Sequence, residues 1–150
     1  DQVWARFTLA AHLMEERAYA EADELLQLAE ADLGAVVVDR LRIEAAVRAQ
    51  RAQLAERRGA HEEAIPLYER AIAACEHWRA QEPDQFRALG VLFPCLRDFA
   101  RVLSARGESD RAREMMGRAI EAAEAKLRAF DQDPMRFHSV RISTYEGARM

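Results

Sequence analysis

The sequence predicts an all-α fold of stacked helical hairpins, from a repeated alanine pattern, short turns within that pattern and a composition rich in helix formers. Three times along the chain an alanine is followed twelve residues later by a second, and seven residues after that by a third. The triplets are Ala10, Ala22 and Ala29; Ala52, Ala64 and Ala71; and Ala100, Ala112 and Ala119. Small side chains at this spacing let two antiparallel helices approach closely, while larger neighbours fill the gaps.

A short turn separates the first alanine from the second in each triplet. The turns read Arg17-Ala18-Tyr19, Arg58-Gly59-Ala60-His61 and Arg106-Gly107-Glu108-Ser109. Gly59 and Gly107 stand where a helix is expected to end, because glycine adopts the left-handed conformation of a helix C-cap at little cost. Each triplet is therefore expected to form one hairpin.

The composition supports the same fold class. The chain has 150 residues, of which 50% are apolar and 32% charged, as in an ordinary single globular domain. Alanine, leucine, glutamate and arginine are abundant, and these residues favour helices. The net charge of −4 is modest and the two signs are interspersed, so we expect no direct binding of nucleic acid.

Seven helices are expected. In order, they span about residues 3–16, 20–32, 36–57, 62–81, 84–105, 110–130 and 134–147. The first is predicted from Trp4, Phe7, Ala11 and Met14, which recur at steps of three and four residues and so share one helical face. The second ends near Gly34, and the third is closed by Gly59.

Prolines affect the predicted course of the later helices. Pro66 falls in the first turns of the fourth helix, where its missing N–H is best tolerated. Pro94 falls inside the fifth helix with Gly90 just before it, so we expect this helix to be split or sharply kinked. Asp133 and Pro134 form an N-cap and first-turn pair for a short final helix.

These features resemble the tetratricopeptide repeat (TPR). The nine alanines match the family's small residues in the middle of the first helix and near both ends of the second. Gly59 and Gly107 match the glycine of the turn. The bulky residue of the second helix is matched by Leu26, Tyr68 and Met116.

The match is incomplete after the turn, where Tyr19 fits the family's aromatic residue but His61 and Ser109 do not. The resemblance implies a right-handed α-solenoid of three TPR-like helical hairpins plus a C-terminal helix. Its repeats would span residues 3–36, 45–78 and 93–126, with a capping segment at 134–150, all within one domain of residues 1–150. The long spacing is similar to that of extended-repeat variants in bacterial regulatory and scaffold proteins.

In this family the concave surface, lined by the first helices, holds an extended peptide or a partner helix. The partner-binding residues that the resemblance implies here are Phe7, Met14, Ala49, Gln50, Gln53, Arg57, Arg97 and Arg101. Glutamine can both donate to and accept from a peptide backbone. Arg97 and Arg101 lie four residues apart on one helical face and could clamp a carboxylate. The alternative is a solvated pair balanced by Asp98 and Glu108.

Catalytic and metal-binding functions are not expected. The chain contains no glycine-rich phosphate loop, nucleophile elbow or HExxH motif. Cys75 and His77, with Cys95 elsewhere, lack the paired spacing of a zinc site. The two cysteines are expected to be buried free thiols, which fits a reducing, cytoplasmic compartment. No cofactor is expected either.

We expect the chain to be a protein–protein interaction module that binds a peptide or a partner helix. Acidic peptides and acidic helices are among the expected partners. One alternative is a sensor or regulatory domain of a multidomain bacterial signalling or transcription regulator. Another is a scaffold that self-assembles into a homo-oligomer through its exposed ends, suggested by Trp4 and the apolar residues near the C-terminus. No apolar run is long enough for a membrane span. Because the chain begins at Asp1 without Met, we expect it to be part of a longer protein.

Overall fold

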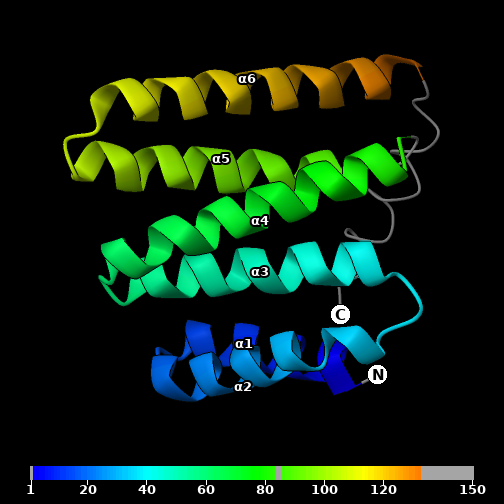
Figure 1. The fold of residues 1–150 in the computed structure, drawn as a ribbon, viewed down its shortest axis with the longest axis vertical. Helices are drawn as coiled ribbons and strands as arrows, with labels where there is room; N and C mark the ends of the chain where they lie inside the picture. The colour runs from blue at the N-terminus through cyan, green and yellow to red at the C-terminus, as the bar shows by residue number, and fades with distance from the viewer. Residues whose placement is uncertain (1, 84–85, 133–150) are drawn as a thin grey trace, which may run out of the picture.

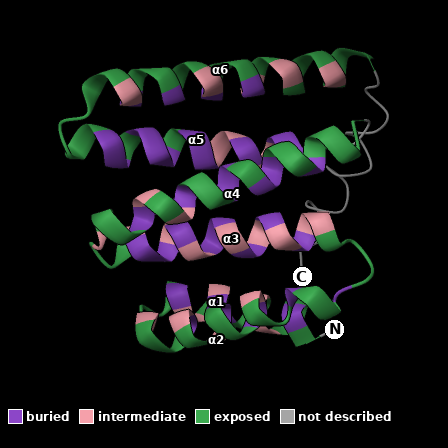
Figure 2. Ribbon diagram, in the orientation of Figure 1, coloured by how far each residue is buried: buried purple, intermediate pink, exposed green. Residues whose placement is uncertain are grey.

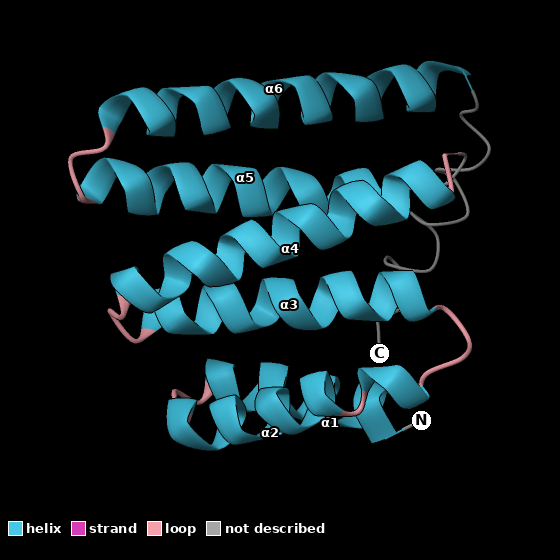
Figure 3. Cartoon of the chain, in the orientation of Figure 1, coloured by secondary structure: helices cyan, strands magenta, loops and turns pink. Residues whose placement is uncertain are grey.

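The computed structural model describes residues 2–83 and 86–132, and every regular element in these ranges is helical (Figure 3). The elements are α1 (Gln2–Glu15), α2 (Tyr19–Ala31), a 3-10 turn η1 (Leu33–Ala35), α3 (Arg40–Arg57), α4 (His61–Gln81), α5 (Arg87–Ala105) and α6 (Ser109–Gln132). The all-α class is therefore confirmed for the described residues. None of these helices is both long and apolar enough to cross a membrane.

Helices that follow one another in sequence also lie side by side (Figure 1). Three helix pairs, α1–α2, α3–α4 and α5–α6, are each closed by a short turn. Two junctions join the pairs, one between α2 and α3 and the other between α4 and α5. α3 also touches α5 directly, which brings the first helices of the second and third pairs together.

The three turns share one hydrogen-bond pattern. An N–H just after the turn donates to a carbonyl five residues earlier: Ala18 to Leu13 (2.8 Å), Ala60 to Ala55 (2.9 Å) and Glu108 to Leu103 (3.0 Å). The left-handed residue in each turn is Arg17 (φ 60°), Gly59 (φ 76°) or Gly107 (φ 81°), so both glycine predictions are confirmed. Equivalent residues are thus 42 positions apart between the first and second pairs, and 48 between the second and third.

The nine alanines of the repeated pattern are all buried, as the sequence predicts. The largest apolar cluster joins α3, α4, α5 and α6, and two smaller clusters lie among α1, α2, η1 and α3 (Figure 2). At the α4–α5 junction, the rings of Tyr68 and Phe99 stack with centroids 5.9 Å apart. Small residues at the helix contacts and large ones between them make up the core.

The predicted start of the third helix at Val36 is wrong. Val36 is extended, and α3 begins at Arg40 after Asp39, which adopts a left-handed conformation (φ 55°). Three consecutive valines carry β-branched side chains that disfavour helix. Val36 instead packs into the core cluster that contains Leu33 and Val47, which fixes the chain in a non-helical connection.

The predicted split of the helix at Pro94 is also wrong, because α5 is one helix from Arg87 to Ala105 (Figure 1). Proline has no backbone N–H, so the helical hydrogen bond from position 94 to the carbonyl of Gly90, four residues earlier, is missing. On either side of the proline, Leu92, Cys95 and Leu96 are buried in the large cluster. Packing against α4 and α6 therefore maintains the helix. The helix predicted at residues 134–147 lies outside the described residues.

Candidate functional site

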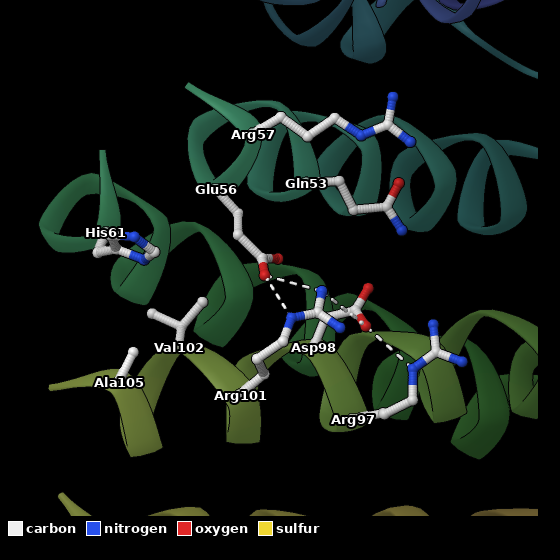
Figure 4. Close-up of a pocket in the computed structure, with 9 residues that line it drawn as sticks. All are labelled: Gln53, Glu56, Arg57, His61, Arg97, Asp98, Arg101, Val102 and Ala105. Carbon is white, nitrogen blue, oxygen red and sulfur yellow. Dashed lines mark hydrogen bonds and ion pairs between the residues drawn. The ribbon is translucent and has the colours of Figure 1, made fainter. Parts of the chain in front are cut away.

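A cavity of about 570 Å³ lies between α3 and α5, beside the start of α4 (Figure 4). Its lining residues are Gln53, Glu56 and Arg57 of α3, His61 of α4, and Arg97, Asp98, Arg101, Val102 and Ala105 of α5. The lining therefore combines three arginines with two carboxylates. It carries a net positive charge when His61 is neutral.

Helical spacing brings these groups to one side of the molecule. Gln53 and Arg57 are four residues apart on α3, as are Arg97 and Arg101 on α5, so each pair shares a face. A neighbouring face of α3 is anchored by Leu54, which is buried against α1 and α2. The direct contact between α3 and α5 then sets the two polar faces side by side.

Glu56 is the centre of a network that ties three helices together. Its carboxylate accepts hydrogen bonds from the Tyr68 hydroxyl of α4 and from Nε of Arg101 of α5, the latter at 2.8 Å. Burial, followed by the hydrogen bond to Glu56, raises the pKa of Tyr68 well above its usual range. The hydrogen bond to Glu56 likewise raises the pKa of Arg101. Both donors therefore stay protonated.

Asp98 is the second carboxylate, and it is buried. It accepts from Nε of Arg97 at 3.0 Å and lies 3.3 Å from Nη2 of Arg101. Arg101 thus bridges Glu56 and Asp98, and its main role is to neutralise them. In the alternative prediction, Asp98 and Glu108 balance the charges of Arg97 and Arg101. The structure confirms Asp98 but puts Glu56 in place of Glu108.

Arg57 and Arg97 each contact one carboxylate of the described residues, whereas Arg101 contacts two. Arg57 has one ion-pair contact, 3.6 Å from Glu15 of α1, and half of its side chain is exposed. Arg97 holds Asp98 through Nε, its guanidinium carbon lies 5.5 Å from the centre of the Phe93 ring, and its two terminal nitrogens point away from Asp98 (Figure 4). The amide of Gln53 lies between these two guanidinium groups. This triad presents hydrogen-bond donors from two helices to the same space.

The structure brings four of the eight suggested partner-binding residues together at this cavity: Gln53, Arg57, Arg97 and Arg101. The other four lie elsewhere. Met14, Ala49 and Gln50 are buried between helices, so their side chains offer a partner no surface. Phe7 is half-buried and stacks on Trp4 with ring centroids 5.0 Å apart. Met14, Ala49 and Gln50 therefore pack in the interior instead of lining a groove.

Sequence reasoning missed Glu56 as a member of the site. Glu56 and Arg101 are separated by 45 residues, and no spacing rule connects them. One signal was present, since Glu56 stands beside Arg57 on the helix face that was predicted to line the groove. A carboxylate next to such a face is a candidate partner for an arginine on the first helix of the following helix pair.

Both carboxylates of the cavity are engaged within the chain. Glu56 accepts hydrogen bonds from Tyr68 and Arg101, and Asp98 accepts one from Arg97. In the described part of the chain, no group of three or more His, Cys, Asp or Glu residues is arranged to hold a metal. Cys75 and Cys95 are free and buried, as predicted. Contact with Cys75, together with burial, raises the pKa of Cys95 far above its usual range.

No protein-family model matches the chain, and no curated protein matches it either. The TPR resemblance therefore stays a prediction, based on the alanines and turns. The geometry of the cavity is the remaining guide to function.

Proposed function

We propose that this chain is a protein–protein interaction module, built as a right-handed solenoid of three TPR-like hairpins. The cavity between α3 and α5 would bind an acidic side chain of a peptide or partner helix. Three equivalent turns and nine buried alanines support the repeat. Net positive charge in the lining supports an acidic ligand.

The observation that carries this proposal is the placement of Arg57 and Arg97 on either side of Gln53 (Figure 4). Arginine binds carboxylates with paired, charge-assisted hydrogen bonds, which are among the stronger polar contacts in proteins. The Gln53 amide can donate to or accept from a neighbouring peptide group. A carboxylate between the two arginines would therefore be held from both helices at once.

Arg101 has a different role in this proposal. It bridges Glu56 and Asp98, so replacing it would leave the poorly solvated Glu56 without a counter-charge and Asp98 with Arg97 alone. Such a loss destabilises the fold instead of probing the ligand. The test of binding must therefore use Arg57 and Arg97.

The proposal is tested with an array of acidic peptides and a matched array in which every Glu and Asp is replaced by Gln and Asn. Acidic peptides should bind the wild-type chain, and the matched amide peptides should not. The double variant Arg57→Gln/Arg97→Gln should weaken binding about 10- to 100-fold, because charge-assisted hydrogen bonds are lost. Fluorescence anisotropy of the best peptide measures the change.

The matched control is Arg79→Gln/Arg128→Gln, which removes the same charge from exposed positions outside the cavity. It should bind the peptide as the wild type does. Equal weakening in both double variants would show only a general charge effect. Equal binding of acidic and amide peptides would overturn the proposed carboxylate site.

A further inference from the structure

The last helix of the described residues, α6, exposes side chains whose equivalents are buried at the α4–α5 junction. Met116 of α6 is equivalent to Tyr68 of α4 and to Leu26 of α2, given the shared register of the turns. Tyr68 and Leu26 are completely buried, whereas Met116 is 41% exposed. One turn further along, Ile120 is 53% exposed, although its α4 equivalent, Ile72, is buried.

The first helix shows the complementary pattern. Leu9 of α1 is equivalent to Phe99 of α5, and it is 49% exposed where Phe99 is buried. Ala5 is exposed, whereas its equivalents Val47 and Cys95 are buried. Within the described residues, α1 and α6 therefore each display one half of the contact that the interior junctions complete.

We propose that the outer face of α6, which carries Met116 and Ile120, binds the outer face of α1 in a second copy of this chain. The outer face of α1 carries Ala5 and Leu9. The contact would repeat the α4–α5 junction between two molecules, head to tail. This inference rests on the equivalence of the helix pairs and is independent of the cavity between α3 and α5.

The apolar positions of the two faces match in the register of the interior junctions. At the α4–α5 junction, Tyr68 stacks on Phe99. The equivalent pair between molecules is Met116 with Leu9 of the second copy, which again sets one large apolar side chain against another. Exposed apolar side chains gain from removal from water in proportion to the area that they bury.

Small residues also meet small residues in this register. Leu33 and Val47 share a core cluster at the α2–α3 junction, and their equivalents between molecules are Ala123 and Ala5 of the second copy. A pair of alanines permits a close approach of the two helices. Helices at this contact would therefore come together at least as closely as in the interior.

The charges are complementary as well. At the α2–α3 junction, Asp23 and Arg58 form an ion pair of 3.5 Å. Their equivalents between molecules are Arg113 of α6 and Glu16 of the second copy, so the signs are exchanged but remain opposite. Opposite charges at an interface rim favour one register and disfavour others.

Trp4 was the residue that the sequence suggested for self-assembly. In the structure it stacks on Phe7, and the guanidinium carbon of Arg42 lies 4.9 Å from the centre of its ring. Trp4 is thus engaged within its own chain. Leu9, not Trp4, occupies the position that Phe99 uses at an interior junction.

A contact between two different faces leaves one free face on each molecule that it joins, so it produces chains, or rings where the rotation closes, instead of two-fold dimers. A single helix-on-helix contact is small beside stable protein interfaces, and the association should be weak. Sedimentation velocity of the 150-residue chain should therefore cover a series from about 10 μM to about 1 mM. The mean mass should rise steadily over that range.

Three single variants separate this arrangement from other modes of association. Leu9→Glu and Ile120→Glu each place a charge on one of the two faces, and each should sediment as a monomer throughout the series. Leu28→Glu is the matched control, since Leu28 of α2 is 51% exposed but lies on neither face. It should associate as the wild type does. Circular dichroism checks that all three keep the helical fold.

Mixing the two monomeric variants gives the decisive result. Leu9→Glu keeps an intact α6 face and Ile120→Glu keeps an intact α1 face, so an equimolar mixture should form a one-to-one dimer and nothing larger. A wild type that stays monomeric overturns the proposal. Association that survives Leu9→Glu would indicate α6 pairing with itself, and association that survives Ile120→Glu would indicate α1 pairing with itself. Either outcome also overturns it.

The register is tested through the charges. Arg113→Glu and Glu16→Arg should each weaken association, by about two- to fivefold, because exposed ion pairs contribute little. The chain that carries both substitutions should recover the wild-type association, since the opposite signs are restored. Failure of this recovery would overturn the proposed register.

Discussion

The α2–α3 and α4–α5 junctions occupy equivalent places, yet they are built from different chemistry. Glu30 and Arg51 form an ion pair between α2 and α3. The equivalent residues between α4 and α5 are Ile72 and Phe99, both buried in the largest apolar cluster. The same helix register thus accepts opposite charges at one junction and apolar side chains at the other.

This difference divides the apolar core near the N-terminus. Two separate clusters lie there, one around Leu33 and Val47 and the other around Leu26 and Leu54. A partly exposed ion pair contributes little to stability, because water already solvates both charges in the unfolded chain. The α1–α2 pair is therefore held less firmly than α5–α6 and should open first in local unfolding.

The largest effect on stability is expected from a substitution that breaks the apolar α4–α5 junction. Phe99→Ala removes a buried ring that stacks on Tyr68, and it should lower the free energy of unfolding by about 3–5 kcal/mol. Arg51→Ala at the equivalent position should cost about 1 kcal/mol, because Arg51 is partly exposed. Urea unfolding followed by circular dichroism measures both. Equal losses would contradict the contrast between the two junctions.

An intermediate effect comes from copying the apolar pair into the first junction. Glu30→Ile/Arg51→Phe replaces the ion pair with the residues of the α4–α5 junction. It should raise the free energy of unfolding by about 1–2 kcal/mol, since apolar replacements of partly buried ion pairs are often stabilising.

Hydrogen exchange provides the local measurement for this double variant. Amides of α1 and α2 should exchange more slowly, whereas those of α5 and α6 should not change. The single variant Glu30→Ile is the matched control and should be destabilised, because it leaves Arg51 without its nearest carboxylate. A double variant less stable than this single one would show that the ring does not fit at position 51.

The features that the sequence predicts correctly depend on neighbours in the chain. A buried alanine such as Ala64 and a turn glycine such as Gly59 follow from helix spacing and from backbone conformation alone. The same local rules predict the all-α class and place the C-terminal ends of five of the six described helices within one residue of those observed.

The features that it misses depend on contacts across helices. Local rules favoured a helix from Val36 and a break at Pro94, but core packing decided otherwise at both places. At the site, the pairing of Glu56 with Arg101 arises from the α3–α5 contact, which no periodicity specifies. An alanine can line a groove or pack in the core, and the residue type does not distinguish the two roles. The burial of Ala49 assigns it to the core.

The smallest expected effect concerns the turns. Arg17 and Gly59 have the same left-handed conformation, which costs a residue with a side chain about 1–2 kcal/mol. Arg17→Gly should therefore stabilise the protein, by about 0.5–1 kcal/mol once the greater freedom of glycine in the unfolded chain is subtracted. Gly59→Ala should destabilise it by about 1 kcal/mol through backbone strain alone, because an added Cβ would meet no atom within 4 Å.

Gly34→Ala is the matched control, since Gly34 has equal space around it but no left-handed conformation. That variant should be neutral or slightly stabilised, because alanine restricts the unfolded chain. Thermal melts of the three variants give the comparison. A loss of stability in Arg17→Gly would mean that the arginine side chain stabilises its turn by more than the strain costs. In that case the first turn would differ from the other two in chemistry as well as in sequence.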